Sequence, residues 1–264
     1  MAPGFVDAHF HIFAAHEGVP GSRYIPTYDA TLGAWTAAAQ ACGVTHGVLV
    51  QPSFLGADHR RLLDALRAHP DRLRGVAVVD PEEPQERLQA LHAAGVRAIR
   101  LNLVGRLSSF ENWRRAGALW EALQALGWHV EVYTGVGELP QVLPHLPRRL
   151  TLVVDHLGRP DAADLDDPTI ASVLRRAESG PVYVKATGAY RLEGRPADAI
   201  ARLWARHLGV ERLLWGSDWP CTNHEALARY PALLAQAGDW LGPEAVAAVA
   251  GGNARRLYWR DDDR

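Results

Sequence analysis

Cysteine and lysine are nearly absent from this sequence of 264 residues. The two cysteines, Cys42 and Cys221, have neither the spacing of a zinc motif nor the density of a secreted disulfide scaffold, so we expect two unpaired thiols. The basic side chains are almost all arginines, and Lys185 is the only lysine. Because arginine is always charged and presents a planar fork to carboxylates, interior arginines are candidates for binding an acidic molecule.

Long hydrophobic runs and a strong net charge are also missing. No apolar stretch approaches the roughly 18 residues that suggest a membrane span, and the beginning lacks the basic and apolar segments of a signal peptide. We therefore expect a cytoplasmic protein with no membrane partner. A net charge of -2 does not indicate nucleic-acid binding or any other partner chosen by bulk charge. The oligomeric state stays open.

Glycine-rich phosphate loops are the third absence. Neither G-x-G-x-x-G nor G-x-x-x-x-G-K-[ST] occurs, which argues against a doubly wound nucleotide-binding sheet. No linker or low-complexity segment divides residues 1–264, so we expect a single domain.

A repeat of strand and helix runs through the chain instead. The predicted strands cover Gly4–His11, Thr45–Gln51, Arg74–Asp80, Val96–Asn102, Trp128–Thr134, Leu150–His156, Val182–Thr187 and Arg212–Asp218. The predicted helices cover Thr31–Ala41, Asp58–His69, Glu82–Ala94, Asn112–Leu126, Glu138–Leu146, Pro196–Leu208 and a tail that ends at Tyr258. Eight such units of about 25 to 40 residues favour an α/β fold of the (β/α)8 TIM-barrel type.

The first predicted strand carries a His-x-His pair. Because side chains alternate along a strand, Asp7, His9 and His11 are expected on one face, and Val6, Ala8 and Phe10 on the other. Two imidazoles about 7 Å apart can hold a metal or polarise a carbonyl, or they can be core histidines satisfied by hydrogen bonds.

Polar side chains recur where the predicted strands end. Active sites of such barrels lie at the carboxyl ends of the strands. The residues at these ends are His9, His11, Gln51, Ser53, Arg100, Asn102, Tyr133, Asp155, His156, Lys185, Thr187, Ser217 and Asp218. Independent core residues would not accumulate charge in this way, because an unpaired buried charge costs several kcal/mol. The pattern therefore predicts a catalytic site.

Five motifs in this order resemble the amidohydrolase superfamily, in the branch of the 2-pyrone-4,6-dicarboxylate lactonases. They are Asp7-Ala8-His9-Phe10-His11, Val50-Gln51-Pro52-Ser53, Arg100-Leu101-Asn102, Asp155-His156-Leu157-Gly158 and Trp215-Gly216-Ser217-Asp218-Trp219-Pro220. The resemblance extends almost to the carboxyl end, where Asn253 to Tyr258 also match.

The resemblance implies a lactonase that opens a small carboxylated ring with water. Asp218 would be the general base, and His9, His11 and His156 would polarise the lactone carbonyl. Substrate carboxylates and oxygens would be bound by Arg100, Arg106, Arg191, Tyr133, either Tyr24 or Tyr28, and Ser53. The sequence does not tell which lactone is opened.

Several of these residues have plain structural alternatives. Asp218 could cap the Pro220 turn, and Ser53 could shape the Pro52 turn. Arg100 could pair with a neighbouring carboxylate, and Lys185 is expected to be structural or one end of an interior ion pair. A barrel that binds an acidic metabolite without catalysis is the remaining reading.

The metal requirement has two readings. Two-metal members of the superfamily use a lysine on an early or middle strand, whereas the only lysine here, Lys185, lies on the seventh predicted strand. Single-zinc relatives usually have a histidine where this chain has Tyr133 and Thr134. His9, His11 and Asp218 could still hold one Zn²⁺. Because arginines are expected in the same mouth, we favour a reaction without metal or other cofactor and keep a mononuclear zinc hydrolase or decarboxylase, or a sugar lactonase, as the alternative.

Overall fold

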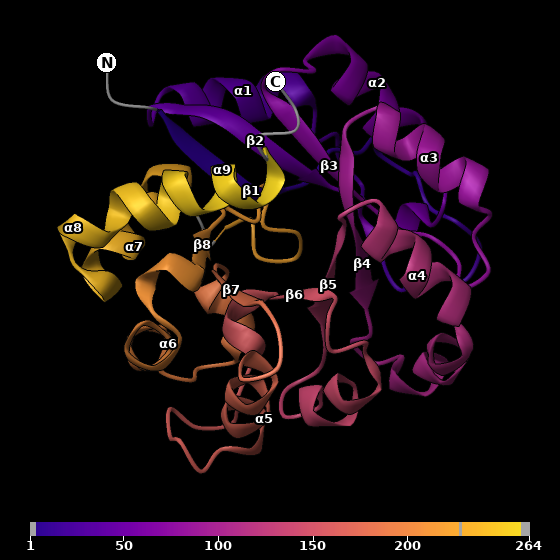
Figure 1. The fold of residues 1–264 in the computed structure, drawn as a ribbon. Coiled ribbons are helices and arrows are strands. Elements are labelled where there is room, and N and C mark those ends of the chain that lie inside the picture. Colours follow the sequence, from indigo (N-terminus) through magenta and orange to yellow (C-terminus); the bar gives the residue numbers. More distant parts are fainter. Residues whose placement is uncertain (1–3, 227–228, 260–264) are drawn as a thin grey trace.

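The computed structural model describes residues 4–226 and 229–259. Eight parallel strands form one sheet in sequence order, and helices surround them (Figure 1). The strands are β1 (Phe5–Phe10), β2 (Val44–Val50), β3 (Leu73–Ala77), β4 (Val96–Asn102), β5 (His129–Tyr133), β6 (Thr151–Val154), β7 (Val182–Ala186) and β8 (Leu213–Trp215). The segment after β8 returns to β1, because the Asp218 N–H donates to the His9 carbonyl at 2.8 Å and the His11 N–H to the Trp219 carbonyl at 2.8 Å. The predicted TIM barrel is confirmed.

The α-helices lie between or after the strands, and two of them begin at capping side chains that can be read from the sequence. They are α1 (Leu32–Gln40), α2 (Arg60–Ala68), α3 (Gln85–Ala93), α4 (Gly117–Ala125), α5 (Pro168–Ala177), α6 (Ala197–Leu208), α7 (Tyr230–Leu241), α8 (Pro243–Ala247) and α9 (Asn253–Tyr258). The Thr31 hydroxyl caps α1, and Asp167 caps α5 by accepting from Thr169 at 2.8 Å and Ile170 at 3.2 Å. No helix was predicted at α5, although Asp167 followed by Pro168 is a helix-start signal.

Two predicted helices differ from the structure. The predicted helix Glu138–Leu146 is wrong, because this segment forms two short 3₁₀ turns, Leu139–Gln141 and Leu143–His145. Each turn contains a proline, which has no N–H to donate to the preceding turn of an α-helix. The predicted helix Asn112–Leu126 begins inside a 3₁₀ segment, Leu107–Arg115, and only Gly117–Ala125 is α-helical.

The barrel interior has an apolar layer at its amino-terminal end. Val6, Ala8, Val48, Val50, Val76, Ala98, Val153, Leu214 and Tyr258 form one buried cluster. Because this cluster takes residues from six of the strands, it lies inside the barrel. Tyr258 comes from α9, which lies close to β1 in Figure 1 and covers this end of the barrel. Glu131 and His129 of β5 contact Tyr258, so buried polar side chains lie directly against this cluster.

The expected face for Asp7 is wrong. The pairing of β1 with β2 shifts register between Asp7 and Phe10, as at a β-bulge. Asp7 accordingly turns away from the histidines toward the helices, where its carboxylate accepts hydrogen bonds from Trp35 at 2.9 Å and Tyr230 at 2.8 Å. Its role in the structure is to tie β1 to α1 and α7.

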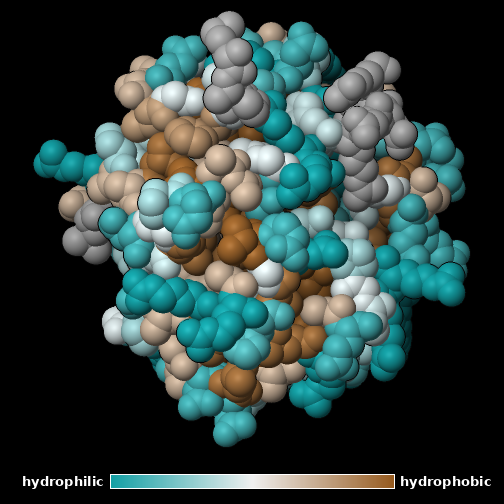
Figure 2. Space-filling view, turned by 60° about the vertical axis from the view of Figure 1, so that its left-hand side comes forward, coloured by the Kyte–Doolittle hydropathy of each residue, from teal (hydrophilic) through white to brown (hydrophobic). Residues whose placement is uncertain are grey.

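The surface and the thiols add little that points to a partner. In the described residues only Val19, Ile25 and Leu165 are large exposed hydrophobic side chains. Figure 2 shows hydrophobic side chains in strips between hydrophilic ones on one face. Cys42 and Cys221 are unpaired, as expected. None of the described helices has the length and apolar character that crossing a bilayer requires.

Candidate active site

A cavity of about 250 Å³ opens at the carboxyl ends of the strands. Its wall brings together eight of the residues predicted from the sequence, namely His11, Tyr24, Ser53, Arg100, Arg106, Tyr133, Arg191 and Asp218. His9 and His156 are fully buried and contact this group. The amino-terminal imidazoles, the mid-chain arginine and the late carboxylate thus surround one space. We call His9, His11, His156 and Asp218 the cavity floor.

The two histidines of β1 and the carboxylate after β8 meet at the floor. The Nε2 atoms of His9 and His11 lie 3.3 Å apart. Oδ1 of Asp218 lies 3.7 Å from Nε2 of His9 and 3.5 Å from Nε2 of His11. Gly216 permits this close approach, because a Cβ atom there would lie 2.7 Å from the His9 Cβ atom.

One carboxylate oxygen of Asp218 accepts hydrogen bonds, and the other accepts none from the described residues. Oδ2 accepts hydrogen bonds from the Tyr190 hydroxyl at 2.9 Å and from Nε of Arg191. Oδ1 has no hydrogen-bond partner among the described residues. Burial alone would raise the pKa of Asp218, but the Arg191 guanidinium and the nearby imidazoles hold that pKa well below its usual value. Asp218 is therefore an ionised carboxylate with one oxygen available for a proton.

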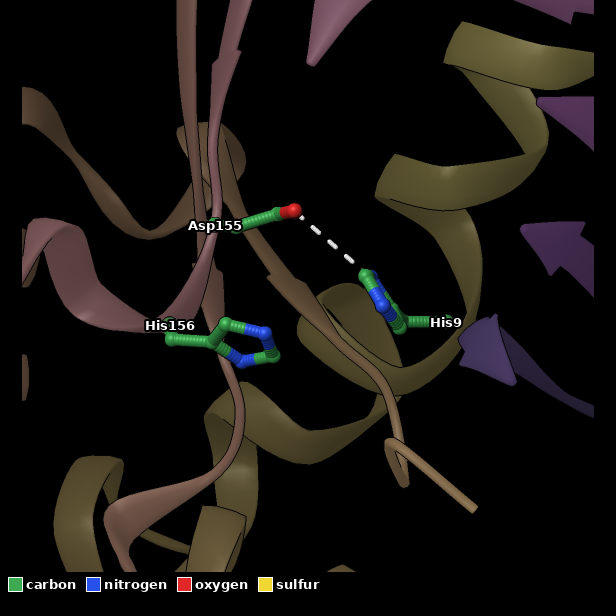
Figure 3. A group of neighbouring side chains, drawn as sticks. All are labelled: His9, Asp155 and His156. Carbon is green, nitrogen blue, oxygen red and sulfur yellow. Dashed lines mark ion pairs between the residues drawn. The ribbon is translucent and has the colours of Figure 1, made fainter. Parts of the chain in front are cut away.

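His156 directs its ring toward the same place. Figure 3 shows the His9 and His156 rings and the Asp155 carboxylate pointing toward one another. Nδ1 of His156 lies 2.8 Å from the Thr187 hydroxyl, and its Nε2 atom has no partner among the described residues. Burial holds the pKa of His156 well below its usual value, so the ring is neutral.

Two residues of the cavity floor, Asp218 and His156, have left-handed backbone conformations. Asp218 has φ of 56° and His156 has φ of 49°. This region is unfavourable for residues other than glycine, and such strain persists where the surrounding structure imposes it, often at functional sites.

Charged groups fill the barrel below the floor. Nζ of Lys185 lies 2.6 Å from Oε2 of Glu131, 3.0 Å from Nδ1 of His9 and 3.4 Å from Oδ1 of Asp155. Nε of Arg100 donates to Oδ2 of Asp155 at 2.8 Å. The expected interior ion pair of Lys185 is therefore present, and Arg100 both pairs with a carboxylate and lines the cavity.

Four arginines surround the cavity. Arg100, Arg106 and Arg191 were predicted, and Arg23 from the loop after β1 was missed. Arg23 donates to the Asn102 side chain at 3.3 Å and to the Val104 carbonyl, and its pKa is lowered by burial and by the nearby Arg106. Its position directly before Tyr24 was the only available signal. Like charges gathered in this way suit an anionic molecule.

The remaining predicted residues divide between wall and support. Tyr24 lines the cavity, whereas the Tyr28 hydroxyl donates to Glu225 at 2.6 Å and Tyr28 is not on the wall. Ser53 lies on the wall and accepts from the Asn102 side chain at 3.1 Å. The Tyr133 ring packs against His156 with ring centroids 4.7 Å apart. We call Arg23, Tyr24, Ser53 and Arg106 the cavity rim.

Two groups of side chains have ligand atoms close enough for a metal ion, within 4.8 Å of one another. They are His9, His11 and Asp218, and His9, Asp155 and His156. Each group already contacts a fixed cation, because Arg191 pairs with Asp218 and Lys185 contacts both His9 and Asp155. A divalent ion in either group would be repelled by that cation. The ligand atoms of each group are nevertheless of the kinds that bind Zn²⁺, so their geometry would allow one ion in spite of this repulsion.

A family model for amidohydrolases matches residues 6–260. The chain belongs to the amidohydrolase family. Within this family it is 32% identical to the 2-pyrone-4,6-dicarboxylate hydrolase of Comamonas testosteroni, over 99% of this chain and 92% of that protein. This agrees with the branch indicated by the sequence motifs.

Solved structures of amidohydrolase relatives have the same fold. A Pseudomonas putida protein assigned as a 2-pyrone-4,6-dicarboxylic acid hydrolase is 37% identical, with a TM-score of 0.86 over 99% of both chains. An Acinetobacter baumannii protein with the same assignment, crystallised with citric acid bound, is 29% identical, with a TM-score of 0.84 over 97% of this chain and 99% of that one.

Proposed function

We propose that this protein is a lactonase that hydrolyses a small ring bearing carboxylates, such as 2-pyrone-4,6-dicarboxylate. The observation that carries the proposal is the free Oδ1 atom of ionised Asp218 beside three buried imidazoles, in a cavity with four arginines. The 2-pyrone-4,6-dicarboxylate hydrolase related over nearly the whole chain supports the substrate class.

Asp218 acts as the general base of the reaction. A water molecule donates one hydrogen to Oδ1 of Asp218 and the other to Nε2 of His11, two atoms 3.5 Å apart. As Asp218 takes the proton, the water oxygen bonds to the lactone carbonyl carbon. This changes the role expected for His11 from polarising the carbonyl to orienting water, since its Nδ1 atom lies 2.7 Å from the Val50 carbonyl and donates to it.

His9 and His156 stabilise the negative charge that develops on the carbonyl oxygen. The electrons of the carbonyl bond move to that oxygen, where N–H donors are most effective if they are fixed in advance. When the carbonyl re-forms, the bond to the ring oxygen breaks, and the proton held by Asp218 passes to the leaving oxygen. The products are a carboxylic acid and an enol or alcohol on one open chain.

The arginines select a substrate with carboxylates. Arg100, Arg106 and Arg191 bind these groups, assisted by Tyr24, Tyr133 and Ser53, and Arg23 joins this set. Tyr28 supports the rim through Glu225. Binding of the substrate carboxylate to Arg191 draws this guanidinium from Asp218 and strengthens the base.

We propose that the reaction needs no metal, because Lys185 and Arg191 supply the positive charge that a metal would bring. The zinc alternative rests on the short distances among His9, His11 and Asp218. Metal analysis of the purified protein, with turnover measured before and after a chelator, separates the two. Loss of turnover that zinc alone restores would decide for the zinc enzyme.

The test of the function is a substrate panel. It compares 2-pyrone-4,6-dicarboxylate, a muconolactone, an aldonolactone and an uncharged pyrone by ring absorbance and proton release. We expect turnover of the carboxylated rings and little of the uncharged one. Calorimetric binding of the dicarboxylate without turnover would instead indicate a barrel that binds an acidic metabolite.

A further inference from the structure

Lys185 is the only lysine in the chain, and its side chain is completely buried. Nζ lies 3.0 Å from Nδ1 of His9, on the side of the imidazole that faces away from the cavity. An ammonium group has three hydrogens and accepts none. Oε2 of Glu131 and Nδ1 of His9 each accept a hydrogen from this ammonium, and Oδ1 of Asp155 lies 3.4 Å from it as an ion pair.

This contact fixes where His9 carries its hydrogen. Because Lys185 donates to Nδ1, that nitrogen presents a lone pair, and the hydrogen of a neutral imidazole must be on Nε2. Nε2 of His9 is the atom 3.7 Å from Oδ1 of Asp218. The buried lysine thereby turns the cavity side of His9 into a hydrogen-bond donor.

His11 has the opposite arrangement for an independent reason. Its Nδ1 atom lies 2.7 Å from the Val50 carbonyl, which can only accept, so Nδ1 carries the hydrogen and Nε2 presents a lone pair. The two Nε2 atoms face each other at 3.3 Å. A donor on His9 and an acceptor on His11 are compatible, whereas two donors or two acceptors would not be.

We propose that Lys185 is a positioning residue that holds His9 with its hydrogen on Nε2, so that His9 donates to the substrate carbonyl oxygen. This inference rests on the proposed lactonase function for its catalytic consequence. Glu131 fixes the ammonium from below, because its Oε2 atom accepts from Lys185 while its Oε1 atom accepts from the Tyr258 hydroxyl at 2.5 Å.

If Lys185 is replaced, the Asp155 carboxylate is close enough to become the hydrogen-bond partner of His9. Oδ1 of Asp155 lies 3.5 Å from the same Nδ1 atom and accepts no hydrogen bond from the described residues. If an apolar side chain replaces Lys185, Nδ1 of His9 donates to Asp155 and Nε2 becomes a lone pair. A histidine that binds zinc through one ring nitrogen usually donates the hydrogen of its other ring nitrogen to a carboxylate or carbonyl. Lys185 therefore decides between a hydrogen-bond donor and a metal ligand.

The first test uses the unaltered protein. Nitrogen NMR of protein labelled at the histidine rings distinguishes nitrogens with and without hydrogen, and the His9→Gln variant assigns the His9 signals. We expect Nδ1 of His9 without hydrogen and Nε2 with hydrogen at neutral pH. The reverse assignment overturns the inference even if the protein is an active lactonase. The expected assignment in a protein without lactonase activity leaves the inference on His9 standing and removes the proposed function.

The second test replaces the lysine. In Lys185→Met we expect kcat to fall about 100-fold with KM changed less than about threefold, which is the size of effect of losing one oxyanion donor. Calorimetric titration with Zn²⁺ should show binding at least about tenfold tighter than in the unaltered protein. Unchanged kcat, or no gain in zinc binding, contradicts the inference.

Two further variants separate positioning from folding. Lys185→Met combined with Glu131→Gln removes the ion pair as a neutral whole, and it should show the same loss of kcat and gain of zinc binding if the single variant does not fold. Arg176→Met is the matched control, because Arg176 is also a buried cation but binds the Pro147 and Leu150 carbonyls away from the site. It should lower thermal stability without changing kcat or zinc binding. An equal loss of kcat in the control would show that Lys185 acts only through stability.

Discussion

The floor and the rim of the cavity are built in different ways. His9, His156 and Asp218 of the floor are at most 1% exposed, and each is held by a side chain from β7 or from the segment that follows it, namely Lys185, Thr187 and Arg191. Arg23 and Arg106 of the rim come from loops, are exposed, and are held mainly by backbone carbonyls. We therefore propose that the floor carries out the chemical step of the proposed reaction and that the rim selects the molecule that is bound.

Asp218→Asn is the sharpest test of this comparison. An amide cannot take a proton from water, so we expect kcat to fall by about 10³-fold while substrate affinity changes little. Single-turnover kinetics and calorimetry measure the two effects separately. Asp198→Asn is the control, because Asp198 is a partly exposed acid of α6 that pairs with Arg202. Nearly full turnover in Asp218→Asn would remove Asp218 as the base.

Arg100→Lys tests the boundary between floor and rim. Arg100 is 6% exposed, donates to Asp155 and also lines the cavity. Lysine keeps the charge but loses the planar fork, so we expect KM to rise about 30-fold with a smaller fall in kcat. Steady-state kinetics with the dicarboxylate give both values. A fall in kcat alone would place Arg100 with the floor.

The pH profile tests the floor without any substitution. Burial and the nearby Lys185 lower the pKa of His9 to about 4, and the pKa values of His156 and Asp218 are also lowered. A group with a lowered pKa stays deprotonated as the pH falls toward that value. We therefore expect protonation of His9 to lower kcat/KM about tenfold between pH 5 and pH 3. A kcat/KM that does not fall between pH 5 and pH 3 would contradict this assignment of the His9 pKa.

The same contrast explains what the sequence could predict. The strand pattern and the polar strand ends depend on alternation and local signals, so His9, Arg100, His156 and Asp218 could be placed at one cavity in advance. The turn of Asp7 away from that cavity depends on a bulge in the β1 pairing, which alternation does not reveal.

Loop residues were the least predictable. Arg23 reaches the cavity only because the loop after β1 folds over Asn102 and Val104, a tertiary contact without a local signature. Tyr24 and Tyr28 are four residues apart, and only the folded loop distinguishes the one on the wall from the one bound to Glu225.

We expect Ser53→Ala to have the smallest effect of these substitutions. It tests whether a rim residue affects substrate binding alone. The Ser53 hydroxyl is half-buried on the cavity wall and already has a partner in the Asn102 side chain. Its loss removes at most one neutral hydrogen bond to substrate, about 0.5 to 1.5 kcal/mol, so we expect KM to rise between about twofold and tenfold with kcat unchanged. Thr at the same position keeps the hydroxyl and serves as the matched variant, with KM close to that of the unaltered protein. A fall in kcat that Thr restores would mean that this rim residue takes part in the chemical step, and the division between floor and rim would then fail at Ser53.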